Sequence, residues 1–256
     1  MLFGYEEKTT LFAELAQSGR MGHAYLFFGD AEVGKRTFAR MFARFLETGL
    51  FDESGDPLID TVIVSPDEKG TISIATIREI RQFLFEKPFR APRRTVVIEN
   101  AAALTDQAES AMLKIVEEPP AHALLIMIAE NPTALFQPLA SRFTKVYFPR
   151  MSRARIEEIL KNDHAVPAAQ AREIARASFG RMGRALRLLR SKEAVRTENE
   201  LVRELEDRIL FLYTDGVERN AGKLSWLLAR EEEAKRFNLN PTLQRKALSE
   251  FFASRE

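Results

Sequence analysis

Hydrophobic residues in the first 150 positions form short apolar runs separated by segments with helical spacing. The apolar runs predict five strands, at residues 23–28, 61–64, 95–98, 124–128 and 146–148. Apolar positions three and four apart predict helices at residues 37–46, 75–85 and 105–116. A further helix before the first strand is expected to use Thr9 or Thr10 as its N-cap. Strands that alternate with helices indicate a parallel α/β sheet covered on both faces.

The pattern changes after Pro149, where helical spacing continues and no further strand is indicated. We therefore predict an α/β domain at residues 1–150, a small helical domain at 151–192 and a short third helical segment at 193–256. The helices expected after Pro149 cover residues 156–160, 169–177, 184–189, 201–213, 224–230 and 243–252.

A glycine-rich segment follows the first predicted strand, with the sequence Gly29-Asp30-Ala31-Glu32-Val33-Gly34-Lys35-Arg36-Thr37. The spacing Gly-x4-Gly-Lys between a strand and a helix is that of a phosphate-binding P-loop. Backbone N–H groups and the helix N-terminus in such a loop point at phosphate oxygens, and the lysine reaches the outer phosphates. We expect Gly29, Gly34, Lys35 and Thr37 to form a nucleotide-phosphate site. A tight turn that is kept only for packing is an open alternative.

One position of this loop is unsuited to catalysis. A hydrolytic P-loop has Ser or Thr directly after the lysine, because that hydroxyl ligates Mg²⁺. Here the residue is Arg36, a fixed cation without a metal-ligand atom. Thr37 comes one residue later, about 100° further round the helix. The sequence thus predicts a nucleotide-binding fold that lacks a component of catalysis.

Composition narrows the class of protein. The 256 residues carry a net charge of +1 and are 45% hydrophobic, so a core is assured and no bulk charge dictates a partner. The chain has no cysteine, which excludes disulfides and thiolate zinc sites, and its three scattered histidines predict no metal site. The first residues lack a signal-peptide pattern, and no apolar run has the length of a membrane span. We expect a soluble, cytoplasmic protein with no membrane partner.

Four motifs occur in a fixed order: His23-Ala24-Tyr25-Leu26-Phe27 before the glycine loop, Glu117-Glu118-Pro119-Pro120, Ser141-Arg142-Phe143 before the last strand, and Gly180-Arg181-Met182-Gly183-Arg184-Ala185-Leu186. Over about residues 1–190, this set resembles the bacterial clamp-loader AAA+ proteins. The resemblance implies an AAA+ P-loop sheet, a helical lid and a helical collar that holds subunits in a ring. The segment after Lys192 is short for a collar, so it implies either a reduced collar or a different mode of docking.

The chain departs from the family pattern at two further places. The family's third strand ends in an acidic pair, in which Asp positions Mg²⁺ and Glu activates water. Here the pair is Glu99-Asn100, and Asn is no general base. The four-Cys zinc module of many relatives is also absent, so no zinc is expected. Arg36 and Asn100, two losses in one site, together predict negligible hydrolysis. Weak binding of ATP or ADP and a site without any cofactor both stay open.

The resemblance assigns roles to two arginines. Arg142 matches an arginine finger, which projects into the ATP site of the neighbouring subunit and stabilises charge on the transferred phosphoryl group. The alternative is an ordinary surface arginine paired with a carboxylate. Arg184 matches the lid arginine that contacts nucleotide phosphates in active relatives. The neighbouring arginines could meet the DNA backbone or form a solvated face. They are Arg172, Arg176, Arg181, Arg187 and Arg190, and none of them is singled out as a DNA-binding residue.

The resemblance therefore predicts a subunit of a sliding-clamp loader in DNA replication, as part of the DNA-directed DNA polymerase III holoenzyme. It would not hydrolyse ATP itself and would donate Arg142 to an adjacent motor. Its implied partners are gamma/tau-like ATPase subunits, a delta-like clamp-opening subunit, the sliding clamp and primer–template DNA. Two other functions stay open: an active AAA+ ATPase with unusual Mg²⁺ ligands, and a DNA-binding or regulatory adaptor on a degenerate AAA+ domain.

Overall fold

A computed structural model of the chain describes residues 3–52, 55, 57–190, 200–236, 246–248, 250 and 251. The chain forms two compact units, Met1–Leu186 and Arg187–Glu256. The boundary predicted near residue 150 falls inside the first unit, so the α/β domain and the helices that directly follow it belong to the same compact unit. The boundary predicted near residue 192 lies outside the described residues, and the three-domain division stays a prediction.

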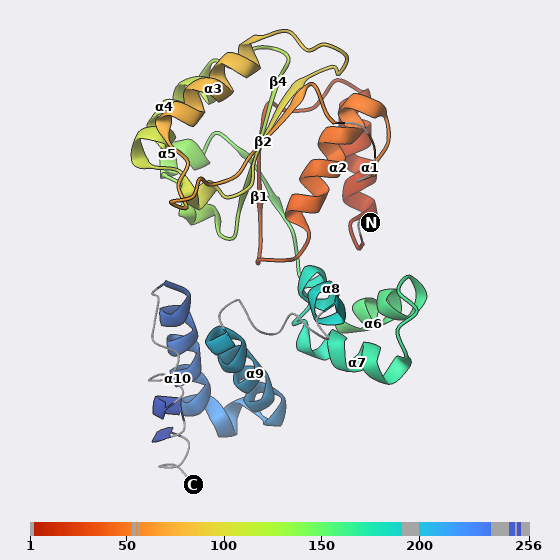
Figure 1. The fold of residues 1–256 in the computed structure, drawn as a ribbon, viewed down its shortest axis with the longest axis vertical. Helices are drawn as coiled ribbons and strands as arrows, with labels where there is room; N and C mark the ends of the chain where they lie inside the picture. The colour runs from red at the N-terminus through yellow and green to blue at the C-terminus, as the bar shows by residue number, and fades with distance from the viewer. Residues whose placement is uncertain are drawn as a thin grey trace. The chain divides into compact units, whose positions relative to one another are not determined.

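The first unit is built on a parallel sheet of five strands in the order β2-β3-β4-β1-β5, which confirms the predicted fold class (Figure 1). The strands are β1 Ala24–Phe28, β2 Thr61–Val64, β3 Arg94–Ile98, β4 Ala123–Ala129 and β5 Thr144–Tyr147. Every residue of the central β4 is buried, because its sequence AlaLeuLeuIleMetIleAla is apolar on both faces. The carboxyl ends of β1, β3 and β4 therefore meet at one edge of the sheet.

Helices cover both faces of this sheet (Figure 1). One face carries α3 Ile74–Phe85, α4 Asp106–Glu117 and α5 Gln137–Ala140, and the other carries α1 Glu6–Gln17 and α2 Lys35–Thr48. Short 3₁₀ turns at Ala101–Ala103 and Pro132–Ala134 complete the connections.

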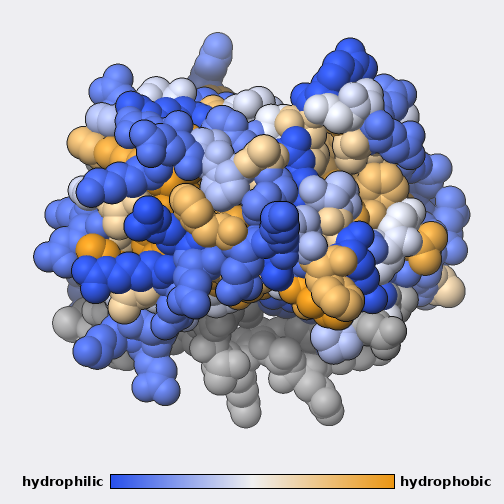
Figure 2. All heavy atoms as spheres, turned by 90° about the horizontal axis from the view of Figure 1, so that it is seen from above, coloured by the Kyte–Doolittle hydropathy of each residue, from blue (hydrophilic) through white to orange (hydrophobic). Residues whose placement is uncertain are grey.

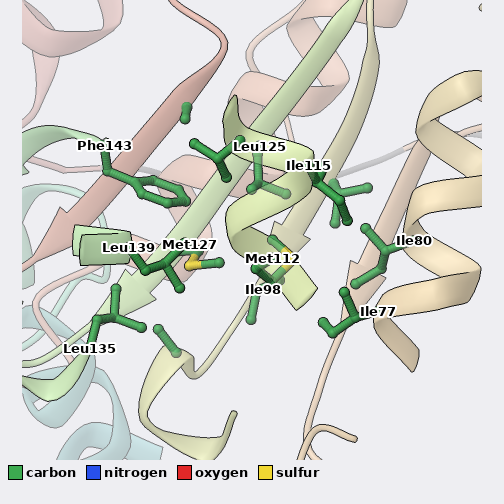
Figure 3. Close-up of a cluster of buried hydrophobic side chains, with 14 of the residues drawn as sticks. Ile77, Ile80, Ile98, Met112, Ile115, Leu125, Met127, Leu135, Leu139 and Phe143 are labelled. Atoms are coloured by element: carbon green, nitrogen blue, oxygen red, sulfur yellow. The ribbon is translucent and has the colours of Figure 1, made fainter. Parts of the chain in front are cut away.

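The two faces have different cores. On the α3–α4 side the core is aliphatic, and Figure 3 shows Ile77 and Ile80 of α3 in one cluster with Met112 and Ile115 of α4. On the α1–α2 side it is aromatic, and Phe12 meets Phe42 edge to face with ring centroids 4.9 Å apart. Other aromatic members of this second core are Tyr5, Phe27, Phe38 and Phe148.

Helix starts follow the predicted chemistry at some places and not at others. Thr105 caps α4 as predicted, since its hydroxyl accepts a hydrogen bond from the N–H of Ala108. The prediction that Thr9 or Thr10 caps the first helix is wrong, because α1 begins earlier, at Glu6. Both hydroxyls instead donate to carbonyl oxygens four residues back, a bond that mid-helix threonines commonly make.

Further helices in the described residues include α6 Arg153–Asn162, α7 Ala168–Ala177, α8 Met182–Arg190, α9 Glu200–Asp215 and α10 Val217–Arg236. The second unit has its own small apolar core, which includes Leu205, Leu212, Leu224, Leu227 and Leu248. The helix predicted at 243–252 falls partly outside the described residues.

The visible surface is mostly hydrophilic. Figure 2 shows one face of the molecule, on which hydrophilic residues predominate and hydrophobic residues form separate patches. None of the helices in the described ranges is long and apolar enough to cross a membrane.

Candidate functional site

A cavity of about 430 Å³ opens where the glycine loop meets the carboxyl ends of β3 and β4. The loop and the first turn of α2 form one wall, and the strand ends form the other. The lining residues are Ala31, Glu32, Gly34, Lys35, Arg36, Thr37, Glu99, Asn100, Ile128, Ala129, Glu130 and Gly183. Of the predicted phosphate-site residues, Gly34, Lys35 and Thr37 thus line one cavity, while Gly29 lies outside its lining.

Two glycines give the loop its shape, since both adopt positive φ angles. Gly29 has φ +139°, and a Cβ added there would lie 2.3 Å from the backbone oxygen of Phe148. Gly34 has φ +112° and would place a Cβ 3.2 Å from the ring of Tyr5. A side chain at Gly29 would therefore strain the backbone and clash with the segment that follows β5. Both glycines are needed for the local path of the chain, whatever the cavity binds.

Lys35 is the first residue of α2 and is 6% exposed. Its ammonium donates hydrogen bonds to the carbonyl oxygens of Gly29 and Asp30, so the loop closes on its own lysine. Burial lowers the pKa of Lys35, and the carboxylates of Glu130 and Asp30 partly oppose that shift. The first turn of α2 has no side-chain cap, so its N–H groups are donors available to an anion in the cavity.

The carboxylate of Glu99, at the end of β3, is already neutralised by arginines of α2. Its side chain is 5% exposed, and its Oε1 accepts hydrogen bonds from Nε and Nη2 of Arg40 at 2.9 and 2.6 Å. Nε of Arg36 lies 3.3 Å from the same oxygen, and the hydroxyl of Ser65 donates to Oε2 at 2.8 Å. We call Glu99, Arg36, Arg40 and Ser65 the Glu99 cluster. Both oxygens of this carboxylate are occupied by protein donors.

The AAA+ fold implies a Mg²⁺–nucleotide complex in such a cavity, and the residues present do not fit the metal. The position after Lys35 offers a guanidinium instead of a hydroxyl, and the Glu99 carboxylate is bonded to two cations. A divalent ion placed there would displace these bonds and face like charges. No group of three or more His, Cys, Asp or Glu side chains in the described ranges is placed to hold a metal ion. The polyphosphate part does fit, through Lys35 and the N–H groups of α2.

Side chains from two other segments hold the loop. The Tyr5 hydroxyl donates to the carbonyl oxygen of Val33 at 2.8 Å, and burial raises the pKa of this tyrosine. Asp30 accepts two hydrogen bonds from the guanidinium of Arg150, at 2.6 and 3.0 Å. The hydrogen bonds from Arg150 lower the pKa of Asp30, against the opposing effect of burial. The loop is thereby tied to the N-terminal segment and to the start of the helical lid.

The lid reaches the loop through its backbone. The N–H of Gly183 donates to the carbonyl oxygen of Glu32 at 2.8 Å, and a Cβ at Gly183 would lie 2.8 Å from the same oxygen. Arg184, the predicted lid arginine, is 4% exposed, and its guanidinium carbon lies 5.0 Å from the ring centroid of Phe179. Among the described residues Gly183 lines the cavity, whereas Arg184 does not. A role for Arg184 at nucleotide phosphates stays a prediction.

Arg142 occupies a different part of the unit, between α5 and the edge strand β5. Its side chain is 37% exposed and does not line the cavity of its own chain, as far as the described residues go. Its guanidinium donates to the carbonyl oxygen of Pro138 and to the carboxylate of Glu117. The next residue, Phe143, is 5% exposed and packs in the aliphatic core with Leu139 (Figure 3). A buried anchor therefore holds an exposed arginine at the sheet edge.

Several residues of the site were not predicted. The bonds of Arg40 and Ser65 to Glu99, and of Arg150 to Asp30, join side chains at least 34 positions apart. Only the spacing of Arg36 and Arg40, four apart on one helix face, was visible in the sequence. Tyr5 lies directly before α1, and no pattern in the sequence indicated that it contacts the glycine loop.

Residues 4–152 identify the family of this chain. The model of the family described as "DNA polymerase III, delta subunit" matches residues 4–152, more than half of the chain. This chain belongs to that family. The match covers the whole parallel sheet, the glycine loop and Arg142.

Curated relatives carry related names. The chain is 28% identical over 180 residues to DNA polymerase III subunit gamma/tau of Mycobacterium tuberculosis, which covers 64% of this chain and 31% of the relative. It is 27% identical over 152 residues to DNA polymerase III subunit delta' of Pseudomonas aeruginosa, which covers 54% of this chain and 46% of the relative. The chain thus spans about a third of the gamma/tau protein and about half of the delta' protein.

Solved structures show the same fold. The RuvB Holliday junction branch migration motor of Thermotoga maritima superposes with a TM-score of 0.55 at 20% identity, over 72% of this chain and 59% of that one. At this identity the likeness concerns the AAA+ fold alone.

Proposed function

We propose that this protein is a delta'-like subunit of a DNA polymerase III sliding-clamp loader, which does not hydrolyse ATP and lends Arg142 to a neighbouring ATPase subunit. The observation that carries the proposal is the contrast within one unit. The Glu99 carboxylate is bonded to Arg36 and Arg40 and is not available to a metal ion, while Arg142 is exposed at the sheet edge outside its own cavity. The family match and the delta' relative support the assembly to which it would belong.

The proposed role explains why the fold is kept without the chemistry. An arginine finger acts through its position, because the guanidinium must reach the developing charge on the transferred phosphoryl group. The sheet and the buried Phe143 fix where Arg142 leaves the domain. The proposed partners are gamma/tau-like and delta-like subunits, the sliding clamp and primer–template DNA, in the bacterial cytoplasm.

The test is reconstitution of the assembly with the full chain. ATPase activity is measured for the chain alone, for the partner subunits with the chain, and for the same assembly with Arg142→Ala. We expect no turnover by the chain alone, and a loss of about 10³-fold or more at the site that Arg142 reaches. Arg155→Ala is the matched control, since Arg155 is also an exposed arginine paired with a carboxylate. Unchanged turnover with Arg142→Ala in a correctly assembled complex would refute the finger.

The similarity to gamma/tau proteins favours a second candidate, an active ATPase subunit. The same experiment separates the two functions. Turnover of ATP by the purified chain at a rate that Lys35→Ala abolishes would establish the second candidate and exclude the first.

A further inference from the structure

We propose that Glu117 is the resting partner of Arg142, and that a phosphate group of the neighbouring subunit's nucleotide displaces Glu117 when the arginine engages. Glu117 is then a positioning residue, which acts on the reaction only through Arg142. The inference rests on the proposed function, because it concerns the arginine that is proposed to reach that nucleotide. It deepens that function by naming the group that sets how readily Arg142 becomes available.

The contacts of the Arg142 guanidinium are the first step. Of its five N–H donors, one on Nη1 is bonded to the carbonyl oxygen of Pro138 and one on Nη2 to the carboxylate of Glu117. Glu117 is its single anionic partner among the described residues. A phosphate oxygen carries negative charge as a carboxylate oxygen does, so it can take the place of Glu117 in a charge-assisted hydrogen bond of the same kind.

The second step is the position of Glu117 on its helix. Glu117 is the last residue of α4, and Glu118 is the C-cap. A helix C-terminus carries a partial negative charge, so carboxylates are unfavourable there. Within the described ranges, Glu117 forms an ion pair with Arg142 and with no other cation. The favourable ionic interaction of Glu117 is therefore with the arginine, and not with the helix that carries it.

The third step is that the backbone on both sides of the pair is held by the core. Leu139 and Phe143, on either side of Arg142, are buried in the same aliphatic cluster as Ile115 of α4 (Figure 3). The N–H of Arg142 donates to the carbonyl oxygen of Leu139 at 3.1 Å. The exchange therefore needs only rotation of two exposed side chains, those of Arg142 and Glu117, about their own bonds.

The exchange is an equilibrium, and this decides which quantity Glu117 affects. While Arg142 rests on Glu117, only a fraction of the assembly has the arginine available, and the apparent affinity for the nucleotide is reduced by that fraction. At saturating ATP the arginine is engaged with or without the carboxylate, so the maximal turnover stays the same. Because an exposed ion pair is weak, the expected change in apparent affinity is about two- to fivefold.

The experiment measures ATPase activity against ATP concentration in the reconstituted assembly with the full chain, with hydrolysis limited to the site next to Arg142. Glu117→Gln removes the negative charge and keeps the shape of the side chain. We expect the half-saturating ATP concentration to fall about two- to fivefold, and the maximal turnover to change by less than about twofold. The difference should shrink as salt is added, because the exposed pair is screened.

Glu118→Gln is the matched control, because Glu118 is the adjacent exposed glutamate and its side chain forms no hydrogen bond or ion pair in the described part of the chain. It should leave the half-saturating ATP concentration unchanged, and circular dichroism verifies that both variants are folded. Three results would each overturn the proposal: an unchanged half-saturating concentration with Glu117→Gln, an equal fall with Glu118→Gln, or a loss of maximal turnover with Glu117→Gln.

Arg142→Ala in the same assembly separates this proposal from the proposed function. If Arg142→Ala removes turnover and Glu117→Gln changes nothing, the arginine finger is supported and only the exchange with Glu117 is refuted. If Arg142→Ala leaves turnover unchanged, the finger and the exchange are both refuted.

Discussion

Two carboxylate–arginine sites in the same unit differ in burial and in what they can do. The carboxylates differ in burial, since Glu99 is 5% exposed and Glu117 is 47% exposed, whereas all three arginines are partly exposed, Arg36 to 61%, Arg40 to 49% and Arg142 to 37%. Breaking a buried ion pair leaves an uncompensated charge, while an exposed pair separates into water at little cost. Glu99 is therefore expected to keep its bonds to Arg40 and Ser65, whereas Arg142 can exchange Glu117 for another anion at little cost. This contrast is what the proposed function requires of a subunit without hydrolysis of its own.

The largest effect on stability is expected at the backbone of the glycine loop, next to the Glu99 cluster. Gly29→Ala places a Cβ 2.3 Å from the carbonyl oxygen of Phe148 at a positive φ angle, so it should lower the free energy of unfolding by about 3 kcal/mol or more. Gly19 also has a positive φ, at +69°, but open space around its Cβ position. Gly19→Ala should therefore cost only about 1–2 kcal/mol. Urea denaturation of both variants measures the difference, and equal losses would show that Phe148 can move aside.

The next effect tests the Glu99 cluster itself. Arg40→Gln removes two hydrogen bonds from a buried carboxylate, and we expect a loss of about 2–3 kcal/mol in the free energy of unfolding. Ser65→Ala removes one neutral donor and leaves both guanidiniums, so about 1 kcal/mol is expected. The two variants are compared by urea denaturation at neutral pH. A loss for Arg40→Gln no larger than that for Ser65→Ala would mean that Arg36 alone compensates Glu99.

The sequence predicted the sheet and the glycine loop better than it predicted the side-chain contacts of the candidate site. The apolar runs located all five strands, most clearly β1, β3 and β4, because buried parallel strands need continuous apolar residues. The Gly-x4-Gly-Lys spacing located the cavity. The pairing of Glu99 with Arg40 could not be predicted, because contacts across 59 positions depend on how α2 crosses the sheet. The start of α1 was misplaced because threonines that bond back to carbonyls inside a helix resemble caps in the sequence.

A smaller effect, with a pH dependence, is expected at the pair of Asp30 and Arg150, which joins the loop to the lid. Arg150 lowers the pKa of Asp30 in the folded state, so this pair stabilises the fold above the unfolded pKa of about 3.9 and loses that contribution as the pH falls through the lowered value. Asp30→Asn should therefore be less stable than the unaltered chain near pH 6, with a difference that shrinks below about pH 4.

Urea denaturation from about pH 6 to about pH 3 follows this difference, and the Arg150→Gln background supplies the control. In that background Asp30→Asn should have a smaller pH-dependent effect, since the strongest of the cations that lower the pKa is gone and only Arg181 and Lys35 remain. A difference that grows toward low pH would contradict the assignment, because a carboxyl with a lowered pKa can only lose stabilising free energy on protonation.

The smallest effect is expected at the surface pair, and it decides whether Arg142 is available to a partner. Glu117→Gln removes the carboxylate that Arg142 contacts, yet the pair is exposed, so the free energy of unfolding should change by less than about 1 kcal/mol. Ion pairs of this kind are also screened by salt, so the change should vanish at high ionic strength. A loss as large as that of Arg40→Gln would mean that Glu117 holds Arg142 as firmly as the Glu99 cluster holds its guanidiniums. An arginine held in that way could not exchange Glu117 for the nucleotide of a neighbouring subunit, because breaking its contact with Glu117 would cost as much free energy as breaking a buried ion pair.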